Sequence, residues 1–219
     1  SEMCIRDRYK RVPDRFPCSR FDCDSVLRYL FCLVFVSAAD FFLTGGGEPM
    51  IRIDHVTFSY GEENENAGGV HDINLTVEDG QCVVLCGESG SGKTTLIKLM
   101  LGFYLPNKGT VKVNDTSLES INPHLWRAKT GAVMQDGFIF SETIAQNIAV
   151  GEEQVDLERL RHAVMVANIR DFIDSLPLGY NTKIGMEGNG ISQGQRQRIL
   201  IARAVYKNPE YLFFDEATN

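Results

Sequence analysis

The sequence lacks the excess of positive charge that typifies nucleic-acid-binding proteins and the long hydrophobic runs that typify membrane-spanning helices. Its 219 residues carry 22 Lys and Arg against 29 Asp and Glu, a formal net charge of −7. An acidic chain is a poor candidate for broad binding of nucleic-acid phosphates, although a local basic pocket for one nucleotide remains compatible with it. The apolar segment Val26–Leu43 is interrupted by Arg28 and Asp40. Its uninterrupted part, Tyr29–Ala39, is shorter than the about 20 apolar residues of a membrane span.

The cysteines give no sign of a metal centre. A zinc site needs close Cys pairs with further Cys or His nearby, and the sequence has no such group. Four of the six cysteines lie in the first 32 residues, and the other two, Cys82 and Cys86, lie in "QCVVLCG". There they are typical of small apolar residues in a buried strand. The core domain is therefore expected to be reduced and cytosolic.

Residues 1–44 differ in character from the rest of the chain. "MCIRDR" (Met3–Arg8) resembles the translation of a transposase adapter used to prepare sequencing libraries. We therefore interpret residues 1–44 as an artefactual segment and residues 45–50, rich in glycine, as a linker. The alternatives for Val26–Leu43 are a buried helix or the tail of a membrane domain. A signal peptide is disfavoured because charged residues crowd both flanks.

Residues 51–219 are long enough for one domain with a substantial core. Alternating or continuous apolar residues predict strands, and a spacing of three to four predicts a helix with Leu96, Met100 and Phe103 on one face. No internal repeats occur. The predicted strands are 50–60, 70–80, 81–87, 109–115 and the final apolar run 211–214, with a polar loop at 61–69 and a helix at 93–104.

A helical region interrupts these strands. From Ser141 to Gly179 the pattern is helical, and Leu157, Leu160, Val164 and Ala167 mark one apolar face that ends before Pro177. Two sheet-forming portions thus flank a helical subdomain at about 137–190.

The segment "GESGSGKT" (Gly87–Thr94) matches the phosphate-binding pattern G-x-x-x-x-G-K-[ST]. Its glycines let several backbone N–H groups point at phosphate oxygens, and the following helix adds the positive end of its dipole. Lys93 supplies a cation for the outer phosphates, and Thr94 offers a hydroxyl to Mg²⁺. The alternative, a Gly/Ser-rich turn with an exposed lysine, is disfavoured by the strand before it and the helix after it. The candidate nucleotide-binding residues here are Gly87, Ser89, Gly90, Gly92, Lys93, Thr94 and Thr95.

The terminal "YLFFDE" supplies the second half of a nucleotide-hydrolysing site. Asp215 at the end of an apolar strand is placed to hold Mg²⁺. Glu216 is placed to accept a proton from the attacking water. The alternative is a pair of solvated carboxylates at a strand end, which the upstream cradle disfavours.

Between these halves, "ISQGQ" (Ile191–Gln195) resembles the signature motif of ATP-binding cassette (ABC) proteins, commonly Leu-Ser-Gly-Gly-Gln. Ile191 and Gln193 depart from that form, whereas Ser192, Gly194 and Gln195 keep it. Ser192 is suited to cap the following helix, whose N-terminus offers a second anion site. The resemblance covers residues 51–219 and implies that this site faces the γ-phosphate of ATP held by another subunit.

Further residues agree with this family. Tyr60 in "FSYG" matches the aromatic residue that stacks on adenine, the alternative being a core tyrosine at a strand end. Gln135 in "AVMQD" matches the glutamine that contacts Mg²⁺ and water. The position at which the family has an acidic residue is occupied here by Met186, and Glu187 is the next residue. The resemblance therefore leaves open which residue takes that role. "GNGISQGQ" (Gly188–Gln195) resembles exporters of double-glycine-leader peptides and bacteriocins, often fused to a cysteine peptidase.

The resemblance implies an α/β P-loop NTPase fold: a RecA-like parallel sheet core with an antiparallel β subdomain and a helical subdomain. It implies ATP and Mg²⁺ as ligands, and an ATPase that powers export across a membrane. The expected partners are the transmembrane domain of the same transporter and a second nucleotide-binding domain, paired head-to-tail. The expected location is the cytoplasmic face of the bacterial inner membrane.

Rival interpretations remain within and outside this class. Another ABC system, a lipid or drug exporter or an importer, is the nearest one. An ABC ATPase of DNA repair is disfavoured by the acidic charge and the absence of a heptad array. In the family a later strand with a switch histidine lies between the two site strands. No histidine follows Glu216. We therefore expect a C-terminally truncated domain of reduced activity, with unpaired backbone in the middle of the sheet.

Overall fold

The computed structural model describes residues 4–7, 31–36, 50–61, 68–78, 80–185 and 190–215. The chain forms two compact units. Unit 1 comprises Ser1–Thr130 and Glu210–Thr218, and unit 2 comprises Gly131–Pro209 with Asn219. Within the described residues, no helix has both the length and the hydropathy needed to cross a membrane.

One sheet of unit 1 is antiparallel and has the strand order β4-β3-β6-β7. Its strands are β3 (Ile51–Ser59), β4 (Gly69–Val77), β6 (Lys108–Val113) and β7 (Thr116–Ser117). Apolar side chains on one face, such as Ile51, Ile53 and Val77, are buried, while Arg52 between them is exposed. The alternation of the sequence therefore predicts these strands correctly.

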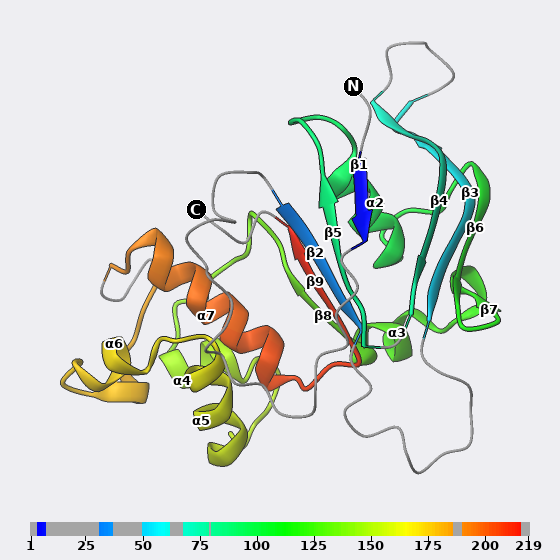
Figure 1. Ribbon diagram of the computed structural model, residues 1–219. Helices are drawn as coiled ribbons and strands as arrows, with labels where there is room; N and C mark the ends of the chain where they lie inside the picture. Colours follow the sequence, from blue (N-terminus) through cyan, green and yellow to red (C-terminus); the bar gives the residue numbers. More distant parts are fainter. Residues whose placement is uncertain are drawn as a thin grey trace. The chain divides into compact units, whose positions relative to one another are not determined.

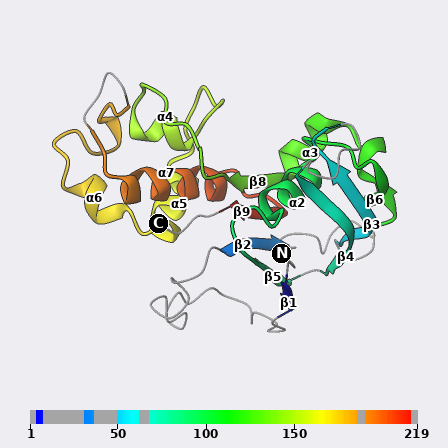
Figure 2. The same cartoon turned by 90° about the horizontal axis from the view of Figure 1, so that it is seen from above.

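The second sheet of unit 1 contains the strands next to the predicted phosphate cradle, β5 (Cys82–Cys86) and β9 (Tyr211–Asp215). Val83 and Leu85 of β5 and Phe213 of β9 are buried. Between them in the sheet lies β2 (Phe31–Val36), which pairs antiparallel with both, so β5 and β9 run parallel to each other. β1 (Cys4–Asp7) pairs antiparallel with the other edge of β5. Both views in Figures 1 and 2 show β2 lying between β5 and β9.

The position of β2 corrects two expectations. A gap with unpaired backbone between β5 and β9 is wrong, because Phe31–Val36 occupies that position. A buried helix is also wrong over these six residues. Two parallel strands present unpaired N–H and C=O groups, and the aromatic and β-branched run "FCLVFV" has a high propensity to pair with them. The interpretation of residues 1–44 as artefactual stays a prediction.

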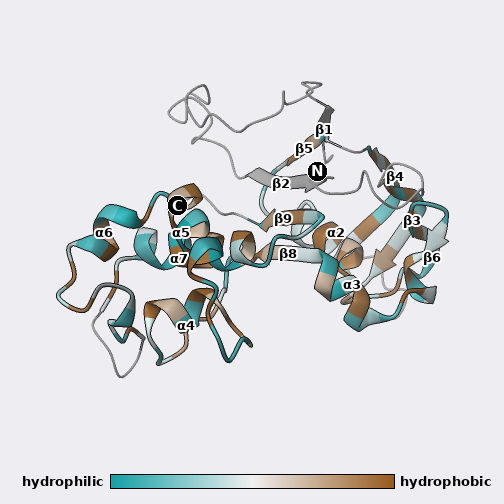
Figure 3. Ribbon diagram, turned by 90° about the horizontal axis from the view of Figure 1, so that it is seen from below, coloured by the Kyte–Doolittle hydropathy of each residue, from teal (hydrophilic) through white to brown (hydrophobic). Residues whose placement is uncertain are grey.

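Helix α2 (Lys93–Met100) follows β5 and buries Leu96, Ile97 and Met100. Part of the helix is coloured brown, as hydrophobic, in Figure 3. The helix ends four residues earlier than the pattern predicts. Gly102 has φ +75°, a left-handed conformation that stops a helix, and Phe103 donates its backbone N–H to Lys98 O at 2.9 Å. The assignment of Phe103 to the buried face is therefore wrong, and its side chain is exposed.

The remaining elements of unit 1 include a helix that contacts the C-terminus of α2 and the start of β9. They are the 3₁₀ helix η2 (Leu118–Ser120) and α3 (Pro123–Lys129). Trp126 of α3 is buried, and its indole N–H donates to Met100 O at 3.1 Å. Its ring packs against Tyr211 with the centroids 5.0 Å apart. One side chain thus joins the C-terminus of α2 to the start of β9.

Unit 2 is mainly helical, as predicted. It contains α4 (Ile144–Ile148), α5 (Leu157–Val166), α6 (Arg170–Asp174), the 3₁₀ helix η3 (Gly179–Asn181) and α7 (Gln193–Tyr206), with most of strand β8 (Thr130–Val133). Leu160, Val164 and Ala167 are buried in its core, as the apolar spacing predicts. Leu157 is exposed, which corrects its assignment to that face. It is the first residue of α5, directly after the N-cap Asp156, where the buried stripe has not yet begun.

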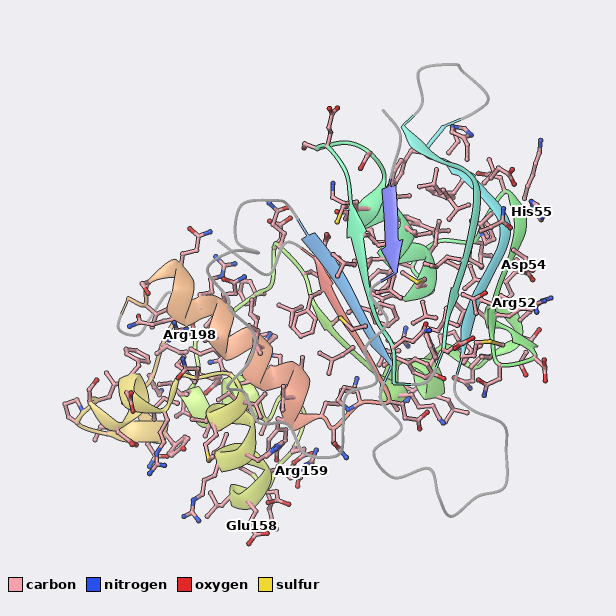
Figure 4. All side chains as sticks on the ribbon, in the orientation of Figure 1. Arg52, Asp54, His55, Glu158, Arg159 and Arg198 are labelled. Atoms are coloured by element: carbon pink, nitrogen blue, oxygen red, sulfur yellow. The ribbon has the colours of Figure 1, made fainter. Side chains whose placement is uncertain are left out.

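Helices α5 and α7 are joined by a polar network around the buried Tyr206. The Tyr206 hydroxyl donates to Glu152 and accepts the backbone N–H of Asp156. Arg159, labelled on α5 in Figure 4, donates to Tyr206 O at 2.6 Å and lies 4.4 Å above the tyrosine ring. This network fixes the C-terminal end of α7 against the start of α5.

Candidate functional site

The phosphate cradle is the turn that connects β5 to α2. Gly90 and Gly92 have φ of +82° and +92°, in the left-handed region that favours glycine. A Cβ atom at Gly92 would lie 2.6 Å from Val70 Cγ1 and 3.0 Å from Gly69 O, whereas one at Gly90 would meet no atom within 4 Å. Gly92 is thus required by both its conformation and its surroundings. The sequence pattern correctly identifies this turn.

Lys93 is buried at the base of the cradle, with 4% of its surface exposed. Its ammonium donates to Gly87 O at 2.9 Å, Glu88 O at 2.8 Å and Ser91 Oγ at 3.3 Å. The alternative of an exposed lysine beside an ordinary turn is therefore wrong. These three oxygens belong to the loop itself, and they hold the Lys93 ammonium on the inside of the cradle.

Thr94 and Asp215 join the two halves of the site within unit 1. The Thr94 hydroxyl donates to Asp215 Oδ1 at 3.0 Å, although the residues are 121 positions apart in sequence. Asp215 is 2% exposed, so the alternative of a solvated carboxylate is wrong for this residue. A hydroxyl and a carboxylate oxygen in contact are hard oxygen ligands, which fit a Mg²⁺ ion. Glu216 lies outside the described residues.

Tyr60 follows β3 and is anchored to the cradle helix. Its hydroxyl hydrogen-bonds to Thr95 Oγ1 at 2.9 Å, and its ring meets Phe58 and Tyr104 edge-on at centroid distances of 5.1 and 5.5 Å. Because 52% of Tyr60 is exposed, it is not the core tyrosine of the alternative interpretation. Its position leaves it able to stack on a planar base. The sequence patterns did not predict the contact of Tyr60 with Tyr104, which follows Phe103 just beyond α2.

The remaining site residues belong to unit 2. Gln135 is exposed in the turn that follows β8. Ser192 caps α7, as predicted: its Oγ accepts the Gln195 backbone N–H at 3.2 Å, while Gln195 Oε1 accepts the Ser192 N–H at 2.8 Å. Gly194 lies in the first turn of α7, where a Cβ atom would meet nothing within 4 Å. Met186 and Glu187 lie outside the described residues.

The two cysteines of β5 precede the cradle directly. Burial raises the pKa of the Cys82 thiol to about 11 from an ordinary value of 9.0. This thiol therefore remains protonated at neutral pH, and it is a poor nucleophile. The interpretation of Cys82 as a small apolar strand residue is consistent with this environment.

Comparisons with known proteins agree with this geometry. The family described as "ABC transporter" matches residues 70–219. The ATP-dependent lipid A-core flippase of Saccharophagus degradans is 42% identical over 169 residues, covering 77% of this chain and 28% of the relative. The exotoxin translocation ATP-binding protein PaxB of Pasteurella aerogenes is 43% identical over 150 residues, covering 68% of this chain and 21% of the relative.

A solved structure of a bacterial Atm1-family ABC exporter with ATP bound is similar as well. Its TM-score is 0.69 at 31% identity, covering 84% of this chain and 32% of that chain. The chain therefore spans less than a third of the length of each of these proteins. The match includes the cradle, the signature segment and the Asp215 strand. The chain belongs to the ABC transporter family and has the fold of its ATPase domain, a P-loop NTPase of mixed α/β structure.

Proposed function

We propose that this chain is the ATP-binding and ATP-hydrolysing module of a membrane exporter. The observation that carries the proposal is the hydrogen bond from Thr94 to the buried Asp215. This hydrogen bond brings the carboxylate at the end of β9 to the phosphate cradle, as an NTPase requires. The family to which the chain belongs supports the same assignment.

ATP binding is assigned to unit 1. The cradle N–H groups and the α2 N-terminus hold the phosphates, with Lys93 beside the outer ones. Tyr60, held by Thr95 and flanked by Phe58 and Tyr104, stacks on the adenine. Thr94 and Asp215 would hold Mg²⁺, and the resemblance to the family assigns a further Mg²⁺ contact to Gln135. When bound, the ion neutralises charge on the phosphate oxygens.

Hydrolysis needs a group that accepts a proton from water. Glu216 directly follows Asp215 and is assigned as that base, and Gln135 is assigned to orient the water. In the proposed mechanism the water oxygen attacks the γ-phosphorus and the bond to the β-γ bridging oxygen breaks. The proton of the water passes to the Glu216 carboxylate. ADP and phosphate then leave.

Two such modules are proposed to pair head-to-tail. Ser192, Gly194 and Gln195 at the start of α7 then face the γ-phosphate of ATP held by the other module. The N-terminus of this 14-residue helix attracts an anion. ATP contacts both subunits only in the closed pair, so binding favours closure and hydrolysis favours reopening.

The proposed partner is the transmembrane domain of the same transporter, at the cytoplasmic face of a bacterial inner membrane. Unit 2 presents an exposed aromatic pair, Phe138 and Phe140, with 58% and 43% of their surfaces accessible. Their rings meet edge-on at 5.2 Å, just after Gln135 in sequence. Exposed aromatic side chains of this kind are typical of protein contacts. We assign this pair to the contact with the transmembrane domain.

The proposed substrate is a peptide or bacteriocin, on the basis of the "GNGISQGQ" segment. The relatives named for exotoxin translocation are compatible with a polypeptide substrate. A lipid or drug is the second candidate, since other relatives are named for lipid A-core flipping and multidrug export.

Transport by the full-length protein distinguishes these substrates. In inside-out membrane vesicles we expect ATP-dependent accumulation of a labelled double-glycine-leader peptide, with none in vesicles of the Lys93→Ala variant. Labelled lipid A and a hydrophobic dye serve as competing substrates in parallel assays. ATP-driven movement of lipid or dye without peptide accumulation would overturn the peptide assignment while leaving the ATPase assignment intact. ATPase activity that depends on DNA and not on membranes would overturn the assignment to export.

A further inference from the structure

Two arginines of α7 bind the segment that follows Gln135. Arg196 donates from Nε and Nη2 to Gly137 O at 3.2 and 2.6 Å. Arg203 donates from Nη1 to Phe138 O at 2.8 Å and from Nε to Asn147 O at 2.7 Å. Seven residues separate the two arginines, which places them on one face of α7, about two turns apart. The same helix face therefore holds both ends of the segment 137–147.

Asn147 organises the inside of this segment. It is completely buried, and its side-chain amide donates to Phe140 O, Glu142 O and Thr143 O at 2.9 to 3.2 Å. Its Oδ1 accepts the Phe140 N–H at 2.8 Å and an Arg203 N–H at 3.3 Å. Arg203 thus contacts the residue that fixes the shape of the loop.

The packing between segment and helix is close. A Cβ atom at Gly137 would lie 2.3 Å from Leu200 Cδ1, so the loop backbone rests directly on α7. Arg203 also lies 5.3 Å from the centre of the Phe140 ring. Arg203 donates to uncharged amide oxygens of Phe138 and Asn147, and desolvation lowers its pKa from the ordinary value. Partial burial of a guanidinium among uncharged acceptors costs free energy that an apolar side chain would not, which favours a positioning role for Arg203.

We propose that Arg196 and Arg203 are positioning residues for ATP hydrolysis. They lock the segment 137–147 to α7, so that Gln135 and the helix cap at Ser192 act as one rigid part. Gln135 lies two residues before the locked segment, and Ser192 lies four residues before Arg196. The exposed pair Phe138 and Phe140 is part of the same body. A displacement there would reach both nucleotide-contacting residues together. This inference rests on the proposed ATPase function.

The test compares arginine variants of the full-length protein. Arg203→Met removes the donors and keeps an extended side chain, and Arg203→Lys keeps the charge without the planar donor fork. We expect kcat for ATP hydrolysis to fall about 10- to 100-fold in Arg203→Met, with KM for ATP changed less than about threefold, because misplacement of catalytic groups affects the chemical step. Arg203→Lys should recover part of the loss.

Arg198→Met is the matched control. Arg198, labelled on α7 in Figure 4, donates to Asn168 O at 2.9 Å, an acceptor that lies outside the segment 137–147. Its kcat should stay within about twofold of wild type, as expected for an exposed substitution. Should Arg203→Met fail to fold, Arg196→Met provides the same comparison, because Arg196 is exposed. Hydrogen exchange should show faster exchange across 137–147 in each locking variant but not in the control.

Three outcomes would overturn the proposal. They are unchanged kcat in folded Arg203→Met and Arg196→Met, a KM increase as large as the kcat loss, or an equal effect of Arg198→Met. The failure of the proposed function looks different. In that case the wild-type protein itself would show no hydrolysis that depends on Lys93.

Discussion

Replacing Lys93 by alanine is expected to abolish useful ATP binding, raising the Kd roughly 30-fold to several-thousand-fold. Lys93 is the buried cation of the cradle, held by Gly87 O, Glu88 O and Ser91 Oγ. With ATP bound, Lys93 would form a charge pair with the outer phosphates. Removing one partner of a buried, hydrogen-bonded charge pair costs about 2 to 5 kcal/mol. The alanine variant lacks both the charge for the outer phosphates and the bonds that shape the loop. Titration calorimetry with ATP and Mg²⁺ on the full-length protein measures this change.

Lys98→Ala is the control for this prediction. Lys98 lies in the last turn of the same helix, one turn and a half beyond Lys93, and is partly exposed. Its removal takes away one positive charge without touching the cradle, so the Kd should change less than about threefold. Thermal unfolding of both variants checks that the fold is retained. Wild-type affinity in a folded Lys93→Ala protein would contradict the assignment of the cradle.

Replacing Glu216 by glutamine is expected to stop hydrolysis while leaving ATP binding intact. Glutamine preserves the size and hydrogen bonding of glutamate but cannot accept the proton of the attacking water. General-base contributions of this kind are about 10²- to 10⁴-fold, and kcat should fall by that factor. Asp215, the preceding residue, keeps its bond to Thr94 in this variant. Size-exclusion chromatography with radiolabelled ATP should detect a stable ATP-bound dimer of the full-length protein.

The matched control is Glu210→Gln, just before β9. Glu210 forms an ion pair with Lys129 at 2.8 Å, and both side chains are partly exposed. An exposed pair contributes about 0 to 1 kcal/mol, so turnover should remain close to wild type. The Glu216→Gln protein turning over ATP at the normal rate would refute the role of Glu216.

Local sequence patterns predict the elements around the site well. The run "CVVLC", the glycine-rich turn and the following helix are each determined by residues close together in the chain. The Ser192 cap is local too, since its partner is Gln195. The exact end of α2 is harder to predict. The apolar spacing extends to Phe103, but the left-handed conformation of Gly102, with φ +75°, ends the helix before it.

Long-range contacts account for most of what the sequence does not reveal. The pairing of β2 with β5 and β9 depends on strand edges far away in the chain. The contact of Arg203 with Asn147 spans 56 residues, and that of Tyr60 with Thr95 spans 35. No local periodicity encodes such pairs. The Thr94–Asp215 contact was expected only because both motifs belong to the same chemistry.

The central claim, that ATP is shared between two head-to-tail modules, is tested most directly with mixed dimers. Lys93→Ala disables the cradle, and Gly194→Asp places a carboxylate in the first turn of α7, where a Cβ atom meets no neighbour. Each variant alone should fail to retain ATP in the dimer, because every site contains one defective half. Co-expressed as a mixed full-length dimer with different affinity tags, the two variants should together form one intact site. Retention of ATP by the mixed dimer, but by neither parent, is the predicted result. A mixed dimer that retains no more ATP than its parents would contradict the account.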